Sequence, residues 1–183
     1  MILPIYAFGN PVLKRKGKPI DTEYKELAQL IENMWETMYN AQGIGLAAPQ
    51  VGLDIRLFLV DSKQLEEEGE DFEGIKKVFI NAEMIEEYDE IEPYEEGCLS
   101  IPQIRADVIR NSSIKISYYD ENFEKNVESF TGINARVIQH EYDHIEGILF
   151  TEKLKPIRKR RIQRKLENIK KGDIKVNYRM KFV

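Results

Sequence analysis

Residues 139–144 read Gln-His-Glu-Tyr-Asp-His, and this stretch carries both histidines of the chain. In a helix, residues four apart lie on one face, so His140 and His144 can hold a single metal ion. Glu141 occupies the neighbouring position, from which it can take a proton from water at the metal. An exposed helix with two idle histidines is the alternative, but random placement gives this spacing in only roughly one case in a hundred. The H-E-x-x-H pattern therefore predicts a metal-binding helix.

A catalytic metal site usually has a third protein ligand and one open position. The extended metalloprotease pattern H-E-x-x-H-x-x-G-x-x-H would place a histidine where this chain has Phe150, so that extension fails. The lone cysteine, Cys98, is by type a small buried hydrophobe or a nucleophile. Because both histidines are already used, a Cys-His-His set is the simplest interpretation. Ligation by a downstream carboxylate stays open, and the candidates are Glu146, Glu152, Glu167 and Asp173.

Three segments in a set order resemble the peptide deformylase family. They are Gly-Ile-Gly-Leu-Ala-Ala-Pro-Gln at 43–50, Glu-Gly-Cys-Leu-Ser at 96–100 and Gln-His-Glu-Tyr-Asp-His at 139–144. The resemblance spans about residues 2–155. It implies a metallohydrolase that removes the N-terminal formyl group from the formyl-methionine of newly synthesised polypeptides and releases formate.

The family resemblance also implies roles for single residues. One divalent ion per chain would be held by Cys98, His140 and His144, with Fe2+ as the native metal and Zn2+, Ni2+ or Co2+ as alternatives. Glu141 would act as the base that takes a proton from water and passes it to the leaving amine. The Gln50 amide and the backbone N–H of Leu99 would stabilise the oxyanion.

The substrate pocket follows from the same resemblance. The peptide would lie as an added strand beside the segment before Cys98. The methionine side chain would fill an apolar pocket lined by Ile44, Gly45, Ile133 and Val137, and Arg105 would contact the peptide backbone or a carboxylate. Arg136, in the first half of the metal-binding helix, has no role assigned by these considerations.

Composition fits a single domain over residues 1–183, with 42% hydrophobic residues in 21.4 kDa. The start of the chain lacks the basic and apolar regions of a signal peptide, and no stretch approaches the length of a membrane span. One cysteine excludes an internal disulfide, which is typical of a reducing compartment. We therefore expect a cytoplasmic protein with no membrane partner.

The spacing of apolar residues predicts an α+β fold, with antiparallel strands packed around the metal-binding helix. A first helix is expected from Asp21 or Thr22, which would cap it, to Gly43, with Trp35 in its buried stripe. Thr131 would cap the metal-binding helix and Gly147 would end it. Strands are expected at 56–61, 77–81, 84–88, 104–110, 114–119 and 126–130, and an acidic mobile loop at 66–74.

The C-terminal region is strongly basic. Residues 153–183 carry 13 basic and 2 acidic side chains, whereas residues 61–96 carry 15 acidic and 3 basic ones. Pro156 would open a basic helix that Gly172 closes, followed by a short strand over 176–182. Such a charge run is either a solvated face or a surface that docks on a polyanion. By family resemblance that partner is the ribosome, and no DNA contact is expected.

Three other interpretations fit parts of the sequence. The Gly43 segment also fits the dinucleotide fingerprint G-x-G-x-x-A, but a helix precedes it and Pro49 follows too closely for a helix to begin. A metallopeptidase with the same H-E-x-x-H chemistry is an enzymatic rival. A nucleic-acid-binding module with a structural metal is the non-enzymatic one.

Overall fold

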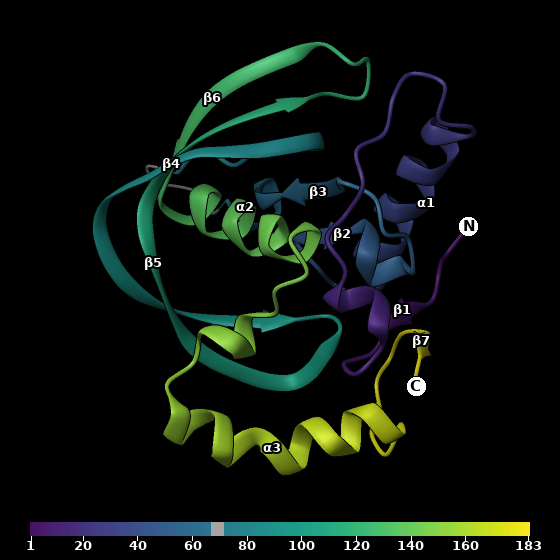
Figure 1. Cartoon of the computed structure of the whole chain (residues 1–183), viewed down its shortest axis with the longest axis vertical. Coiled ribbons are helices and arrows are strands. Elements are labelled where there is room, and N and C mark those ends of the chain that lie inside the picture. The colour runs from purple at the N-terminus through teal and green to yellow at the C-terminus, as the bar shows by residue number, and fades with distance from the viewer. Residues whose placement is uncertain (67–71) are drawn as a thin grey trace.

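A computed structural model of the chain describes residues 1–66 and 72–183. Its main sheet is antiparallel with strand order β2-β3-β4-β5-β6 (Figure 1). The strands are β2 Gly45–Ala47, β3 Leu57–Asp61, β4 Lys76–Cys98, β5 Ile101–Tyr119 and β6 Lys125–Thr131. The predicted α+β fold with antiparallel strands around a central helix is confirmed.

Strands β4 and β5 are one long hairpin rather than the four short strands predicted between residues 77 and 119. Register shifts interrupt β4 near Asn81 and Asp89, both of which have positive φ. Asn81 is fixed there because its side chain accepts a hydrogen bond from Ile20 N and donates one to Ile20 O. These irregularities resemble strand ends in the sequence, although pairing continues through them and brings Cys98 to the end of β4.

The metal-binding helix, α2 (Gly132–Ile145), packs against β2, β3, β5 and β6. Figure 1 shows it enclosed by the curved sheet. Its apolar residues lie in the core, and its polar residues from Arg136 to His140 are buried as well. Thr131 occupies the N-cap position as predicted, but its side chain makes no capping hydrogen bond. The helix ends at Ile145, just before Gly147, whose φ is +73°.

The first helix, α1 (Leu27–Asn40), begins later than predicted. Asp21 caps no helix, because its carboxylate accepts a hydrogen bond from Glu23 N in a local turn. Met34 and Met38 are fully buried. Trp35 is partly buried, packs against the same core cluster and stacks on Tyr39, which agrees with its predicted place in the buried stripe.

The basic helix, α3 (Pro156–Lys171), buries Ile162, Leu166 and Ile169 against the core and ends at Gly172 as predicted. The chain then returns as β7 (Met180–Lys181), which pairs in parallel with β1 (Ile5–Tyr6). Figure 1 shows these two strands side by side, with both termini nearby. The predicted strand over 176–182 is therefore real but shorter.

Short 3-10 helices complete the described chain: η1 Pro11–Lys14, η2 Ala48–Val51, η3 Ser62–Leu65 and η4 Phe150–Lys153. Residues 67–71 of the predicted acidic loop lie outside the described residues. Among the residues that are described, no helix is long and apolar enough to cross a membrane.

Candidate active site

Three potential metal ligands converge where the end of β4 meets α2. The ligand atoms of Cys98, His140 and His144 all lie within 4.8 Å of one another. The Cys98 Sγ atom is 3.2 Å from His144 Nε2. His140 and His144 come from successive turns of one helix face, as the spacing of four predicts. The structure thus assembles the three residues that the sequence suggested as a set.

The chemistry of this set fits a divalent transition metal. One thiol and two imidazoles suit Zn2+, Fe2+, Co2+ or Ni2+ better than Mg2+ or Ca2+. His140 Nδ1 lies 2.9 Å from Glu96 Oε2, which is the arrangement that orients a metal-binding histidine through its other nitrogen. Within residues 1–66 and 72–183, no fourth cysteine, histidine or carboxylate joins the group. A metal ion held by these three residues would keep a fourth position for water or substrate.

Two downstream carboxylates that were open as third ligands have other partners. Glu146 pairs with Arg56 at 2.6 Å, and Glu152 pairs with Lys14 at 2.5 Å. Neither belongs to the cluster of potential ligands.

A buried network of charges supports His140. Arg110 makes two hydrogen bonds to the Glu96 carboxylate, at 2.7 and 3.0 Å, and a third to Asp143 at 2.7 Å. Burial opposes ionisation of Glu96, but hydrogen bonds from His140 and Arg110 outweigh it and hold the pKa of Glu96 well below its ordinary value. Sequence reasoning missed the roles of Glu96, Arg110 and Asp143. Glu96 and Asp143 stand inside quoted motifs, whereas no pattern marked Arg110.

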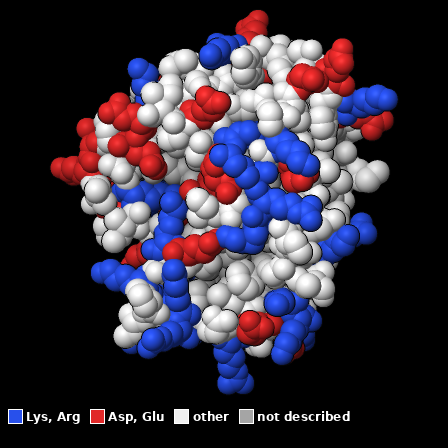
Figure 2. All heavy atoms as spheres, viewed as in Figure 1, with Lys and Arg blue, Asp and Glu red and all other residues white. Residues whose placement is uncertain are grey.

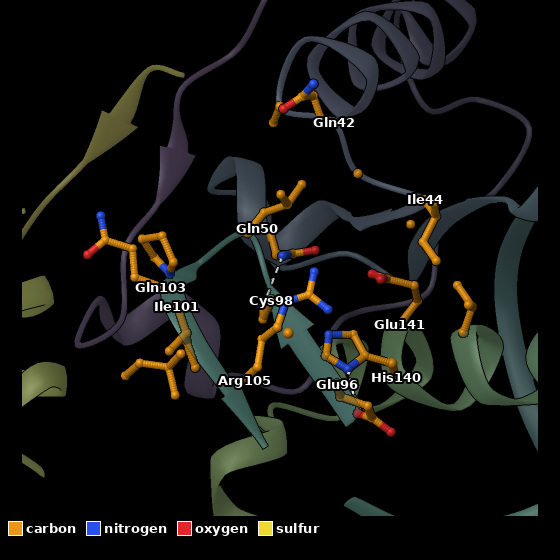
Figure 3. A pocket seen from close by; sticks show the side chains of 18 of the residues that line it. Gln42, Ile44, Gln50, Glu96, Cys98, Ile101, Gln103, Arg105, His140 and Glu141 are labelled. Carbon is orange, nitrogen blue, oxygen red and sulfur yellow. Dashed lines mark hydrogen bonds and ion pairs between the residues drawn. The ribbon is translucent and has the colours of Figure 1, made fainter. Parts of the chain in front are cut away.

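Glu141 lies beside the cluster and faces the cavity (Figure 3). Its Oε2 atom is buried and has no hydrogen-bond partner among the described residues. Burial is the main cause that raises the pKa of Glu141 to about 7. A Cβ atom on Gly45 would collide with the Glu141 carboxylate, 2.8 Å from its Cδ. The first glycine loop therefore leaves the space that this side chain occupies.

Gln50 is held with its amide group toward the cluster. Its Oε1 atom accepts a hydrogen bond from Ala47 N at 2.8 Å, so its Nε2 atom points the other way. Nε2 donates to Ser100 Oγ at 3.3 Å and lies 3.5 Å from Cys98 Sγ. Figure 3 shows Gln50, Cys98, His140 and Glu141 around one space, contributed by η2, β4 and α2.

These residues line a cavity of about 900 Å³. All five predicted substrate-binding residues line it too: Ile44, Gly45, Arg105, Ile133 and Val137. Leu99 borders the same cavity. Its volume suits a short peptide segment rather than a water molecule or an ion alone.

Two other parts of the wall were not anticipated. Arg136, which had no assigned role, is buried and donates hydrogen bonds to Val108 O and to Glu92 O, both at 2.9 Å. It therefore ties both strands of the long hairpin to α2. Residues 175–178, after α3, form another wall of the cavity.

Comparison with known proteins places this geometry in a family. The family model described as polypeptide deformylase matches residues 2–160. A peptide deformylase of Christiangramia forsetii is 56% identical over all of this chain and 96% of its own length. One of Flavobacterium psychrophilum is 53% identical over all of this chain and 98% of its own length.

Solved structures agree with the sequence matches. A plant peptide deformylase crystal structure superposes with a TM-score of 0.83 at 37% identity, covering 93% of this chain and 90% of that one. Sequence, fold and the three motifs lead to one conclusion: the chain belongs to the polypeptide deformylase family.

Proposed function

We propose that this chain removes the formyl group from the N-terminal formyl-methionine of newly synthesised polypeptides, as a metal-dependent amide hydrolase. One observation carries the assignment. Cys98, His140 and Glu141 line a peptide-sized cavity, and His144 joins Cys98 and His140 in one ligand cluster, in a chain of the deformylase family. The substrate and its synthesis place the reaction in the cytoplasm.

The residues divide the chemistry among them. Cys98, His140 and His144 would hold one divalent ion, which when bound supplies Lewis acidity toward the formyl oxygen and the attacking water. Glu141 takes the proton of the attacking water and later gives it to the leaving amine, so that formate and a free N-terminus result.

Gln50 and Leu99 complete the reacting centre. The Gln50 Nε2 amide and the Leu99 backbone N–H would donate hydrogen bonds to the oxygen on which negative charge develops. Gln50 is already oriented for this by its bond from Ala47 N. Ile44, Gly45, Ile133 and Val137 would surround the methionine side chain, and Arg105, which is exposed at the rim, would contact the peptide beyond it.

Fe2+ is our proposal for the native metal. A thiolate donates more charge than a third imidazole and so weakens the ion as a Lewis acid, which leaves more of the proton transfer to Glu141. The same donor set also accepts Zn2+, Ni2+ and Co2+. Metal analysis of protein purified without oxygen decides among them.

Release of formate from formyl-Met-Ala-Ser by anaerobically purified protein tests the activity. Two peptides serve as controls: unformylated Met-Ala-Ser, and a longer unformylated peptide that reports cleavage of internal peptide bonds. Formate release with both control peptides intact supports the proposal. Cleavage of an internal peptide bond would instead identify a metallopeptidase. If the protein neither removes the formyl group nor cleaves a peptide bond, its metal would be structural.

The exposed face of α3 is the proposed contact with the ribosome. Its basic side chains are exposed while Ile162, Leu166 and Ile169 face the core, and Figure 2 shows Lys and Arg on the part of the surface where α3 lies. Removing the whole tail would also remove core side chains, so it cannot test this contact cleanly. Charge reversal at Arg160, Arg161 and Arg164 should abolish co-sedimentation with ribosomes and leave deformylation of a free peptide intact. Phosphate contacts also predict binding that weakens steeply with salt.

A further inference from the structure

We propose that Tyr178 is a positioning residue of the active site, whose hydroxyl fixes the carbonyl group of Leu99, the residue that follows the metal ligand Cys98. The inference rests on the proposed deformylase activity and extends it to a part of the chain with no assigned role. The family model ends at residue 160, before this segment begins.

Tyr178 and Leu99 are in direct contact although they lie far apart in sequence. The Tyr178 hydroxyl donates a hydrogen bond of 2.8 Å to the Leu99 carbonyl oxygen, across 79 residues. Both residues are partly buried and both line the cavity. The bond is therefore partly shielded from water. Hydrogen bonds in such a partly buried place are stronger than on an open surface.

Leu99 needs such support because of where it lies. It follows Cys98 in the two-residue turn between β4 and β5, so its own backbone groups lie outside the regular ladder. Its N–H is the proposed donor to the oxyanion, and such a donor works only when it is held in place before the reaction. Fixing the carbonyl of the same residue restricts how far that residue can rotate.

The tail that carries Tyr178 is itself anchored on both sides. Lys175 O accepts a hydrogen bond of 2.8 Å from Gln103 Nε2, and Arg179 O accepts one of 2.9 Å from Ile5 N. The neighbouring β1 segment holds the other half of the turn, because Phe8 N donates to Ser100 O at 2.9 Å. Figure 1 shows β7 and β1 side by side, and Figure 3 shows the same two strands beside the pocket. The segments around Phe8 and Tyr178 thus hold the Leu99–Ser100 turn from both sides through hydrogen bonds.

Tyr178→Phe removes only the hydroxyl and tests the proposal. Tyr6→Phe is the matched control, because Tyr6 lies in the same small sheet and its hydroxyl contacts the exposed Lys181 instead of the site. Loss of an oxyanion donor costs roughly 100- to 1000-fold in kcat, so loosening one that remains should cost about tenfold. We expect kcat for formyl-Met-Ala-Ser to fall by about tenfold in Y178F, with KM and metal content unchanged, and no fall in Y6F.

A second readout follows the Leu99 amide itself. Cys98 is the only cysteine, so labelling cysteine with ¹³C and leucine with ¹⁵N isolates the Cys98–Leu99 peptide group in one NMR signal. In the zinc-loaded protein, hydrogen exchange at this amide should speed up in Y178F and stay at the wild-type rate in Y6F.

The outcomes separate the two proposals. A wild-type protein that releases no formate sinks the deformylase assignment. An active wild type with equal kcat in Y178F sinks the positioning role alone. A lower melting temperature with unchanged kcat and unchanged exchange at Leu99 would mean that Tyr178 is merely structural, and would overturn the inference as well.

Discussion

At the scale of single residues, Glu141 combines two properties that rarely coexist in a stable core. It is buried, and one of its carboxylate oxygens has no partner among the described residues. A buried carboxylate without compensation costs stability, so such a group persists where the site uses it.

Replacing Glu141 by Gln should separate metal binding from turnover. The amide keeps the shape of the side chain but cannot accept a proton, and general acid–base catalysis contributes about 100- to 10,000-fold. We expect E141Q to keep its metal and lose at least 100-fold in kcat, measured by formate release and metal analysis on the same sample. An active E141Q protein would assign the proton transfer to another group.

The same variant predicts a pH-dependent stability difference in the metal-free protein. Because the pKa of Glu141 is raised to about 7 in the fold, wild type loses stability as pH rises from about 4.3 through 7. E141Q carries no ionisable group there and escapes this loss, which reaches about 3–4 kcal/mol at pH 8. The difference in melting temperature between E141Q and wild type should therefore be near zero at pH 4 and large at pH 8. Zinc should shrink it, because a bound cation favours the carboxylate.

Gly45→Ala tests whether the first glycine loop makes room for that carboxylate. The added Cβ collides with the Glu141 side chain, which must move. We expect kcat to fall by roughly tenfold or more, with metal content near wild type, since Cys98 and both histidines are not touched. Unchanged kcat would show that Glu141 has freedom to shift.

Much of this site was predictable from residue types and spacing. The structure brings the three predicted ligands together, and Cys98, His140, Glu141, Gln50 and the five predicted pocket residues line one cavity, although their roles remain predictions. The contacts of Arg110 and Tyr178 were not predictable, because each joins distant segments and no local pattern encodes it.

At the scale of elements, α3 has two faces with different tasks. Leu166 is buried in the core, so L166A should lower the free energy of unfolding by about 2–4 kcal/mol. Arg161 on the opposite face is exposed, and R161E should change the free energy of unfolding by less than about 0.5 kcal/mol. Denaturant unfolding measures both, and equal effects would mean that the two faces are not distinct.

The elements were easier to predict than their boundaries. Helices α2 and α3 follow from apolar spacing and from Gly147 and Gly172 beyond their ends. The single hairpin β4–β5 was divided wrongly because its bulges carry polar residues such as Asn81 and Asp89, which are typical of turns. The late start of α1 is set by Glu26 in a left-handed conformation, which no residue preference predicts.

At the scale of the whole molecule, the described parts of the two oppositely charged regions form no ion pairs with each other. Among residues 1–66 and 72–183, no salt bridge joins 61–96 to 153–183. Within the described part of 61–96, no carboxylate is therefore ion-paired with the basic residues of α3.

Metal removal should weaken the whole fold, because the three ligands join the end of β4 to α2. A ligand that binds only the native state stabilises it by mass action, about 2.7 kcal/mol at a hundredfold excess over Kd. Chelation should lower the melting temperature in calorimetry, and added Zn2+ should restore it. An unchanged melting temperature would indicate that the site binds metal only weakly.

The parallel pairing of β1 with β7 has a consequence for biosynthesis. Tyr6 and Lys181 are 175 positions apart, so β1 leaves the ribosome long before β7 has been synthesised. Contacts of such large separation form late and slowly. An enzyme that acts on newly made proteins would thus become fully competent only after residues 180–181 of its own chain have been synthesised.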